Sequence, residues 1–247
     1  PTFEPVTSPQ RNVLIEDFTG HDCGNCPDAH VVADEILAAN NGRVAVVAIH
    51  AGPLAEPLPP EFPANWTTPE GELYFSQLDF QVNPIGRVNR EGGANAIWAH
   101  TQWEDETANQ LDDSPSVGLQ MVAELDTNSW DLNVHVYHQW LGENPGSYSL
   151  VVLITESDII APQLEYLDGG GSIVHEDYEH NHMLRSSLSG PAGLTIVENP
   201  AANLAETESY TYEWNQEWDW HNSHVVAFVV RNSDGEVLNV VEKYLHE

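Results

Sequence analysis

Two cysteines separated by two residues, Cys23 and Cys26, carry the clearest chemistry in the sequence. They lie between an apolar run typical of a buried strand and a run with helical spacing, which places Cys23 at a helix N-terminus and Cys26 one turn into the helix. Partial positive charge and free amide groups at that end stabilise a thiolate, so Cys23 is the candidate nucleophile. Cys26 is the candidate resolving thiol, which attacks the mixed disulfide and releases the partner. The spacing therefore predicts a thiol-disulfide oxidoreductase.

Two further residues belong to this candidate catalytic site. Asp17 lies at the end of the preceding strand, six residues before Cys23, and is expected to be a buried proton acceptor for the second thiol. Pro84 directly precedes a strand-like run and is expected to be a cis-proline beside the sulfurs. Asp22 is adjacent to Cys23, and its negative charge opposes thiolate formation. Exchange is therefore expected to be slower than in a dedicated redox enzyme.

Two other interpretations of the cysteines remain open. One is a static disulfide, although a bridge across so short a loop removes only roughly 2 kcal/mol of unfolded-chain entropy, against about 3 kcal/mol for a fifteen-residue loop. The other is capture of copper or zinc by Cys23, Cys26 and His30, because His30 follows Cys26 on the same helix face and thiolates with imidazole suit these metals. Exchange itself requires no cofactor. An oxidising compartment favours the disulfide over the metal.

The residues around the cysteines predict an α/β domain over residues 11–111. Apolar runs at 12–18 and 43–50 are typical of buried strands, and the helix between them completes a β-α-β unit. The other predicted elements are helices at 69–78 and 101–111 and a strand at 85–89. Residues 51–69 contain six prolines and are expected to form an inserted surface loop, and residues 1–10 an extended leader.

The pattern changes after residue 115 to β-rich runs separated by turns. The predicted strands are 117–125, 130–137, 148–155, 209–214, 225–230 and 237–244. Their regular spacing predicts an immunoglobulin-like β-sandwich over residues 116–247, joined to the first domain by a linker at 112–115. The predicted fold class is therefore α/β plus all-β, in two domains.

A second group of histidines, His175, His180 and His182, is expected in a turn-rich connection beside acidic residues. There it is a further candidate for zinc or another divalent ion, with imidazoles bonded to loop backbone as the simpler interpretation. His224 is expected at the surface, flanking a strand.

The composition restricts the partners and the setting. Thirty-nine acidic residues against seven Lys and Arg give a net charge of -32, and Lys243 is the only lysine. Nucleic acids and anionic lipid surfaces require Lys or Arg, so neither is an expected partner. So acidic a surface is typical of a halophilic protein in a saline, extracellular setting. The sequence has no apolar run near the roughly 18 residues of a membrane span and no secretion signal at Pro1, so we expect a mature, processed product.

Part of the chain resembles thioredoxin-fold proteins, over about residues 11–111. The resemblance is carried by Asp17-Phe18 at the end of a strand, by the C-G-x-C motif, and by Pro84 before a later strand. Active thioredoxins usually have Trp before the first cysteine and Pro inside the motif, where this chain has Asp22 and Asn25.

Four segments spread over nearly the whole chain resemble the 28-kilodalton outer-membrane protein family of Gram-negative bacteria. They are residues 13–30, Ile49-His50-Ala51-Gly52, residues 83–90 and residues 180–185. The resemblance implies a thioredoxin-like domain followed by a β domain, exported and displayed on the outer membrane surface, often as a lipoprotein, with protein partners at the envelope. Two functions fit it: thiol-disulfide exchange, or a non-enzymatic surface protein for adhesion, assembly or carriage.

Overall fold

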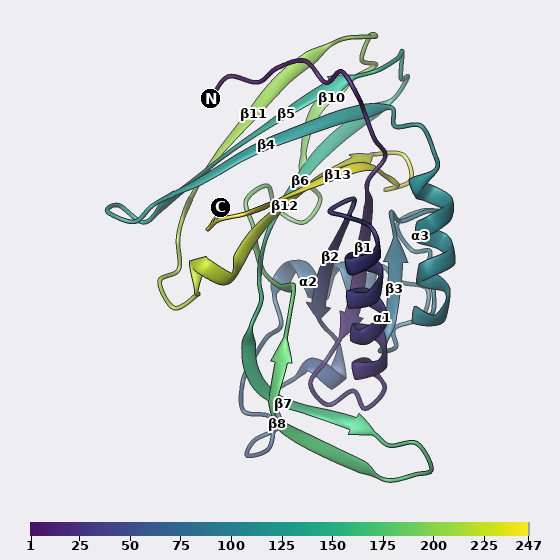
Figure 1. Cartoon of the computed structure of the whole chain (residues 1–247), viewed down its shortest axis with the longest axis vertical. Coiled ribbons are helices and arrows are strands. Elements are labelled where there is room, and N and C mark those ends of the chain that lie inside the picture. The colour runs from purple at the N-terminus through teal and green to yellow at the C-terminus, as the bar shows by residue number, and fades with distance from the viewer. Residues whose placement is uncertain (247) are drawn as a thin grey trace.

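The computed structural model describes residues 1–246, which form a mostly β structure with few helices and several sheets (Figure 1). The helices are α1 (Cys26–Ala39), α2 (Pro69–Ser76) and α3 (Trp103–Leu111). The strands are β1 (Val13–Thr19), β2 (Val44–His50), β3 (Ile85–Val88), β4 (Val117–Asp126), β5 (Asp131–Trp140), β6 (Ser147–Glu156), β7 (Ile159–Tyr166), β8 (Ser172–His180), β9 (Met183–Ser187), β10 (Leu194–Glu198), β11 (Ala205–Glu213), β12 (Ser223–Arg231) and β13 (Val237–Tyr244). The largest sheet has eight strands in the order β13-β12-β6-β9-β2-β1-β3, with β10 paired to β6.

The predicted β-α-β unit over residues 12–50 is confirmed. β1 and β2 pair in parallel, and β3 pairs antiparallel on the other side of β1. β1 is buried along its whole length because both of its faces are covered. Val13 and Ile15 pack against α1 and α3 on one face, whereas Leu14 and Phe18 pack with α2 on the other. The apolar run therefore continues without the alternation of a half-exposed strand.

The six strands predicted after residue 115 are also confirmed. A separate three-stranded sheet, in the order β11-β5-β4, packs against β6, β12 and β13 of the large sheet. The large sheet contains strands from both parts of the chain, since β9 pairs in parallel with β2 and the Ala48 amide donates to the His182 carbonyl at 2.8 Å. The division into two domains at residues 112–115 stays a prediction.

The sequence patterns missed four strands, β7 to β10. β7 and β8 form a two-stranded hairpin that extends away from the large sheet in Figure 1, past the end of α1 at which the cysteines lie. The expected turn-rich connection around His175 and His180 is therefore wrong: both residues belong to β8. Of that group, only His182 lies in a turn, between β8 and β9.

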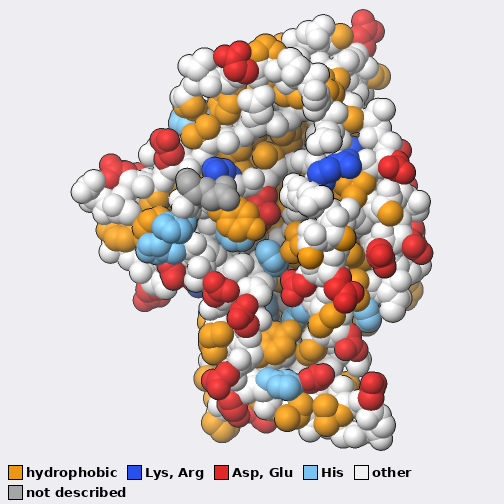
Figure 2. All heavy atoms as spheres, viewed as in Figure 1, with side chains coloured by type: hydrophobic (Ala, Val, Ile, Leu, Met, Phe, Trp, Pro, Cys, Tyr) orange, Lys and Arg blue, Asp and Glu red, His pale blue; other side chains and the backbone are white. Residues whose placement is uncertain are grey.

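Acidic side chains are spread over the face of the molecule shown in Figure 2, with little Lys or Arg between them. Burial sharpens this imbalance, because Arg11, Arg87 and Arg90, three of the seven basic residues, lie inside the protein. The described residues contain no helix that is both long and apolar enough to cross a membrane. The saline setting stays a prediction.

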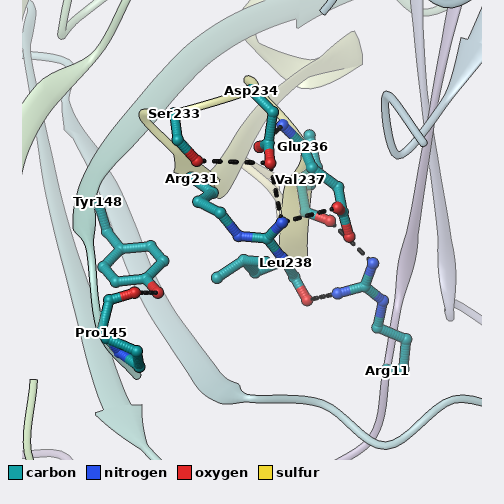
Figure 3. Close-up of polar contacts among 9 residues, drawn as sticks. All are labelled: Arg11, Pro145, Tyr148, Arg231, Ser233, Asp234, Glu236, Val237 and Leu238. Carbon is teal, nitrogen blue, oxygen red and sulfur yellow. Dashed lines mark hydrogen bonds and ion pairs between the residues drawn. The ribbon is translucent and has the colours of Figure 1, made fainter. Parts of the chain in front are cut away.

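Arg11 fastens the beginning of the chain to its last strand (Figure 3). Its guanidinium donates to the carbonyl groups of Val237, at 2.8 Å, and Leu238. Beside it, Arg231 pairs with Asp234 at 2.9 Å and with Glu236 at 3.1 Å, which closes the turn between β12 and β13. These contacts hold β13 beside the entry to β1, the strand that leads to the cysteines.

Candidate functional site

Cys23 and Cys26 form a disulfide at the junction of β1 and α1, with an S–S distance of 2.09 Å and a Cα–Cα distance of 5.4 Å. The Cys26 amide donates to the Cys23 carbonyl at 3.1 Å, which closes a tight turn. α1 begins at Cys26, with Asn25 as its N-cap. Cys26 is therefore the first residue of the helix, not one turn into it, and Cys23 lies in the turn before it. Both cysteines are buried, with exposed fractions of 2% and 0%.

Asp17 lies inside the protein near the end of β1, with 1% of its surface exposed. Its Oδ1 atom has no hydrogen-bond partner, and its Oδ2 lies 3.6 Å from Nε2 of His30. Burial raises the pKa of Asp17 to about 8. A carboxyl group with this pKa is mostly protonated at pH 7 and gains or loses its proton just above neutrality.

His30 on α1 joins Asp17 to the second half of the chain. Its Nε2 lies 2.9 Å from the Thr19 hydroxyl and its Nδ1 lies 2.7 Å from the Tyr178 hydroxyl on β8. Burial, reinforced by the charges of His180 and His182, lowers the pKa of His30 to about 3. His30 is therefore neutral at pH 7, and its contact with the largely protonated Asp17 is not an ion pair.

A cavity of about 40 Å³ lies beside Asp17 and His30. His50 and His180 also line it, and neither ring nitrogen of His50 has a hydrogen-bond partner. A buried water needs roughly 10–15 Å³ of such cavity volume and polar groups to bind. The cavity offers the volume and the polar groups. The site can therefore hold water within reach of the Asp17 carboxyl group.

The β7–β8 hairpin covers the turn that carries the cysteines. The Tyr166 amide donates to the Gly24 carbonyl at 2.7 Å, and the Gln163 side chain donates to the Cys23 carbonyl at 3.0 Å. The Tyr166 ring lies so close to Gly24 that a Cβ atom there would be 2.5 Å from it. A partner that attacks the disulfide must therefore displace this hairpin or approach around it.

The sequence contained a signal for this hairpin that the strand patterns did not use. Asp168-Gly169-Gly170-Gly171 separates a short run that contains Tyr166 from one that contains Ile173 and Val174, and a glycine-rich turn between such runs is typical of a hairpin. The residues that complete the site, Gln163, Tyr166 and Tyr178, come from this segment.

Pro84 lies just before β3. The Asn83–Pro84 peptide bond is cis, as predicted. Because Ile85 pairs with Phe18, Pro84 lies at the end of β1 from which the cysteine turn emerges. Its role in shaping a substrate groove stays a prediction.

The predicted metal ligands Cys23, Cys26 and His30 do not form an open ligand set in the oxidised protein. The two sulfurs are bonded to each other, and both nitrogens of His30 have hydrogen-bond partners. Capture of copper or zinc by these residues stays a prediction for the reduced protein.

Comparison with known proteins places this mostly β chain among proteins of the bacterial outer envelope. Residues 72–247 match the model of the family described as outer membrane protein Omp28. The chain belongs to this family, which confirms the expected resemblance. The match begins after the cysteines, so it identifies the family without describing the disulfide.

Two solved structures support the fold. HBP35 of Porphyromonas gingivalis matches with a TM-score of 0.69 and 18% identity over 97% of this chain and 77% of its own. A structural-genomics protein from Agrobacterium tumefaciens matches with a TM-score of 0.53 and 11% identity over 95% of this chain and 94% of its own. A domain of the outer membrane lipoprotein Omp28 from P. gingivalis has 22% identity over 53% of this chain and 88% of its own, with a TM-score of 0.36. No curated protein matches.

Proposed function

We propose that the chain is an outer-envelope protein whose Cys23–Cys26 pair exchanges disulfides with protein partners. The observation that carries the proposal is a disulfide between β1 and α1 that follows, six residues along the chain, a buried Asp17 whose pKa burial raises to about 8. A carboxyl group that titrates near neutral pH is suited to accept a thiol proton. The proposal assigns residues 11–111 to a thioredoxin-like domain and residues 116–247 to an immunoglobulin-like sandwich, displayed on the outer membrane surface as a lipoprotein.

In the reduced protein, the Cys23 thiolate attacks one sulfur of a partner disulfide. That S–S bond breaks, a Cys23–partner bond forms, and the second partner sulfur leaves as a thiolate. In molecules in which the Asp17 carboxyl group is ionised, the Cys26 thiol then gives its proton to Asp17, and the resulting Cys26 thiolate attacks the Cys23 sulfur. The Cys23–Cys26 disulfide forms again and the remaining partner sulfur leaves as a thiolate, so the partner has gained the two electrons that the pair has lost. Partner thiols drive the same steps in reverse.

A non-enzymatic surface protein with a static disulfide is the second candidate function. The contacts of Gln163 and Tyr166 with the cysteine turn favour it, because buried sulfurs resist attack. In that case residues 11–111 act as a scaffold, and the β part binds partners for adhesion, assembly or carriage.

Alkylation of the reduced protein between pH 5 and pH 10 distinguishes the two candidates. We expect Cys23 to alkylate first, because it precedes the helix N-terminus, and we expect Asp17→Asn to slow closure of the mixed disulfide by Cys26. Cys23→Ala and Cys26→Ala assign each rate to one sulfur. If Cys26 reacts first, the assignment of Cys23 as the nucleophile is wrong. If neither sulfur is reduced in the folded protein, exchange by this pair is excluded.

A further inference from the structure

A second group of chemically active side chains lies away from the disulfide, where three parts of the chain meet. His182 lies between β8 and β9, His224 is the second residue of β12, and Glu242 lies on β13. Each of the three offers one ligand atom, and these atoms all lie within 4.8 Å of one another. The Nδ1 atom of His224 lies 3.0 Å from a carboxylate oxygen of Glu242.

The pairing of β12 with β13 places two of these side chains on one face of the sheet. His224 pairs with Tyr244, and Val226 pairs with Glu242. Residues two apart along a strand share a face, so His224 and Glu242 are diagonal neighbours there. His224 is 4% exposed, which corrects its expected place at the surface.

The backbone of His182 is fixed from two sides. Its amide donates to the Ser157 hydroxyl at 3.0 Å, and its carbonyl accepts from the Ala48 amide at 2.8 Å. Its φ angle is +55°, a left-handed conformation that is uncommon for a residue with a side chain. These contacts hold the His182 ring 5.9 Å from the ring of His224, measured between centroids.

The Nδ1 atom of His182 is buried and has no hydrogen-bond partner. A buried polar atom without a partner is unfavourable, and a bound ligand would offset that cost.

We propose that His182, His224 and Glu242 bind a divalent transition-metal ion with the ligand chemistry of zinc. Two imidazoles and one carboxylate form a common three-ligand zinc set, with the fourth position open to water. Zinc–ligand bonds of about 2.0–2.2 Å place the ligand atoms roughly 3.3 Å apart, so small side-chain rotations would close the set. The bound ion would tie the β8–β9 turn to β12 and β13. This site does not depend on the disulfide.

A competing group in the described residues contains His138, Glu206 and Glu208. It has one imidazole and two carboxylates, with Glu206 exposed and the Glu208 side chain 36% exposed. Because this group has more carboxylate ligands and is more exposed to water, it suits zinc less well than the group that contains His182. The two groups can be tested separately.

Calorimetric titration of the full chain with zinc chloride, after removal of metals with a chelator, tests the proposal. We expect one equivalent to bind, and Glu242→Gln and His182→Asn each to weaken binding at least tenfold. Asn tolerates the left-handed conformation at position 182, and Gln keeps the shape of Glu242, so both variants retain the backbone. Glu208→Gln and His135→Asn serve as controls and are expected to bind zinc as the unaltered chain does.

The proposal is overturned if the unaltered chain binds no zinc. It is also overturned if Glu242→Gln and His182→Asn, shown to be folded by circular dichroism, bind as tightly as the unaltered chain. Loss of binding in Glu208→Gln with retention in Glu242→Gln would assign the ion to the competing group instead.

Discussion

Glu16→Gln is expected to destabilise the protein by about 3–5 kcal/mol, because it leaves two buried guanidinium groups without their carboxylate. Glu16 is 1% exposed in the middle of β1. It accepts from Arg87 at 2.7 Å and from Arg90 at 2.7 and 2.8 Å. Urea unfolding at pH 7, with the disulfide intact, measures the loss.

A matched control is available at the turn between β12 and β13. Asp234→Asn removes a partly exposed partner of Arg231, and such pairs contribute less than about 1 kcal/mol. If Glu16→Gln costs no more than Asp234→Asn, the buried cluster does not stabilise β1 as we infer.

The same cluster predicts how stability depends on pH. Burial alone would raise the pKa of Glu16, but the charges of Arg87 and Arg90 outweigh it and lower the pKa from 4.5 to about 2. A lowered pKa in the folded state stabilises the protein above the unfolded value. This contribution is therefore complete above about pH 4.5 and is lost as the pH falls towards 2, and Glu16→Gln should remove that slope.

Tyr166→Ala is expected to speed reduction of the Cys23–Cys26 disulfide by dithiothreitol about tenfold. The Tyr166 ring lies on Gly24, between the cysteines. Losing that contact weakens the packing of the β7–β8 hairpin over the cysteine turn. A loss of about 1.4 kcal/mol corresponds to a tenfold change in the fraction of molecules in which the disulfide is accessible. The rate is measured in the native protein under excess dithiothreitol.

Ile173→Ala provides the comparison, since Ile173 is an exposed residue on β8 of the same hairpin. It shortens an apolar side chain without touching the contacts of Tyr166 with the cysteine turn. Equal reduction rates in the two variants would show that the hairpin does not limit access to the disulfide.

The elements around the cysteines could be predicted because their patterns are local. β1 and β2 are continuous apolar runs, and the helix spacing after Pro27 is regular. β8 was missed because it is rich in acidic residues and His and lies half exposed, without the alternation of a strand that has one buried face. β8 is stabilised by its pairing with β7, and the residue pattern of β8 alone does not indicate that pairing.

The candidate site was predicted in part for the same reason. Cys23, Cys26 and Asp17 lie within ten residues of one another, so motif spacing finds them. Gln163 and Tyr178 reach the site from 140 or more residues away, and only the folded chain brings them there. The spacing of His30 predicts a metal ligand but gives no sign of its contacts with Thr19 and Tyr178, which the folded chain shows.

The reduction potential of the Cys23–Cys26 pair tests the central proposal most directly. The full chain is equilibrated with dithiothreitol or glutathione redox buffers, and free thiols are trapped by alkylation. We expect reversible reduction of the folded protein at a potential above about -300 mV, the range of disulfides that exchange with partners. A value below about -300 mV, or reduction that occurs only on unfolding, would contradict exchange and identify the pair as a structural bridge.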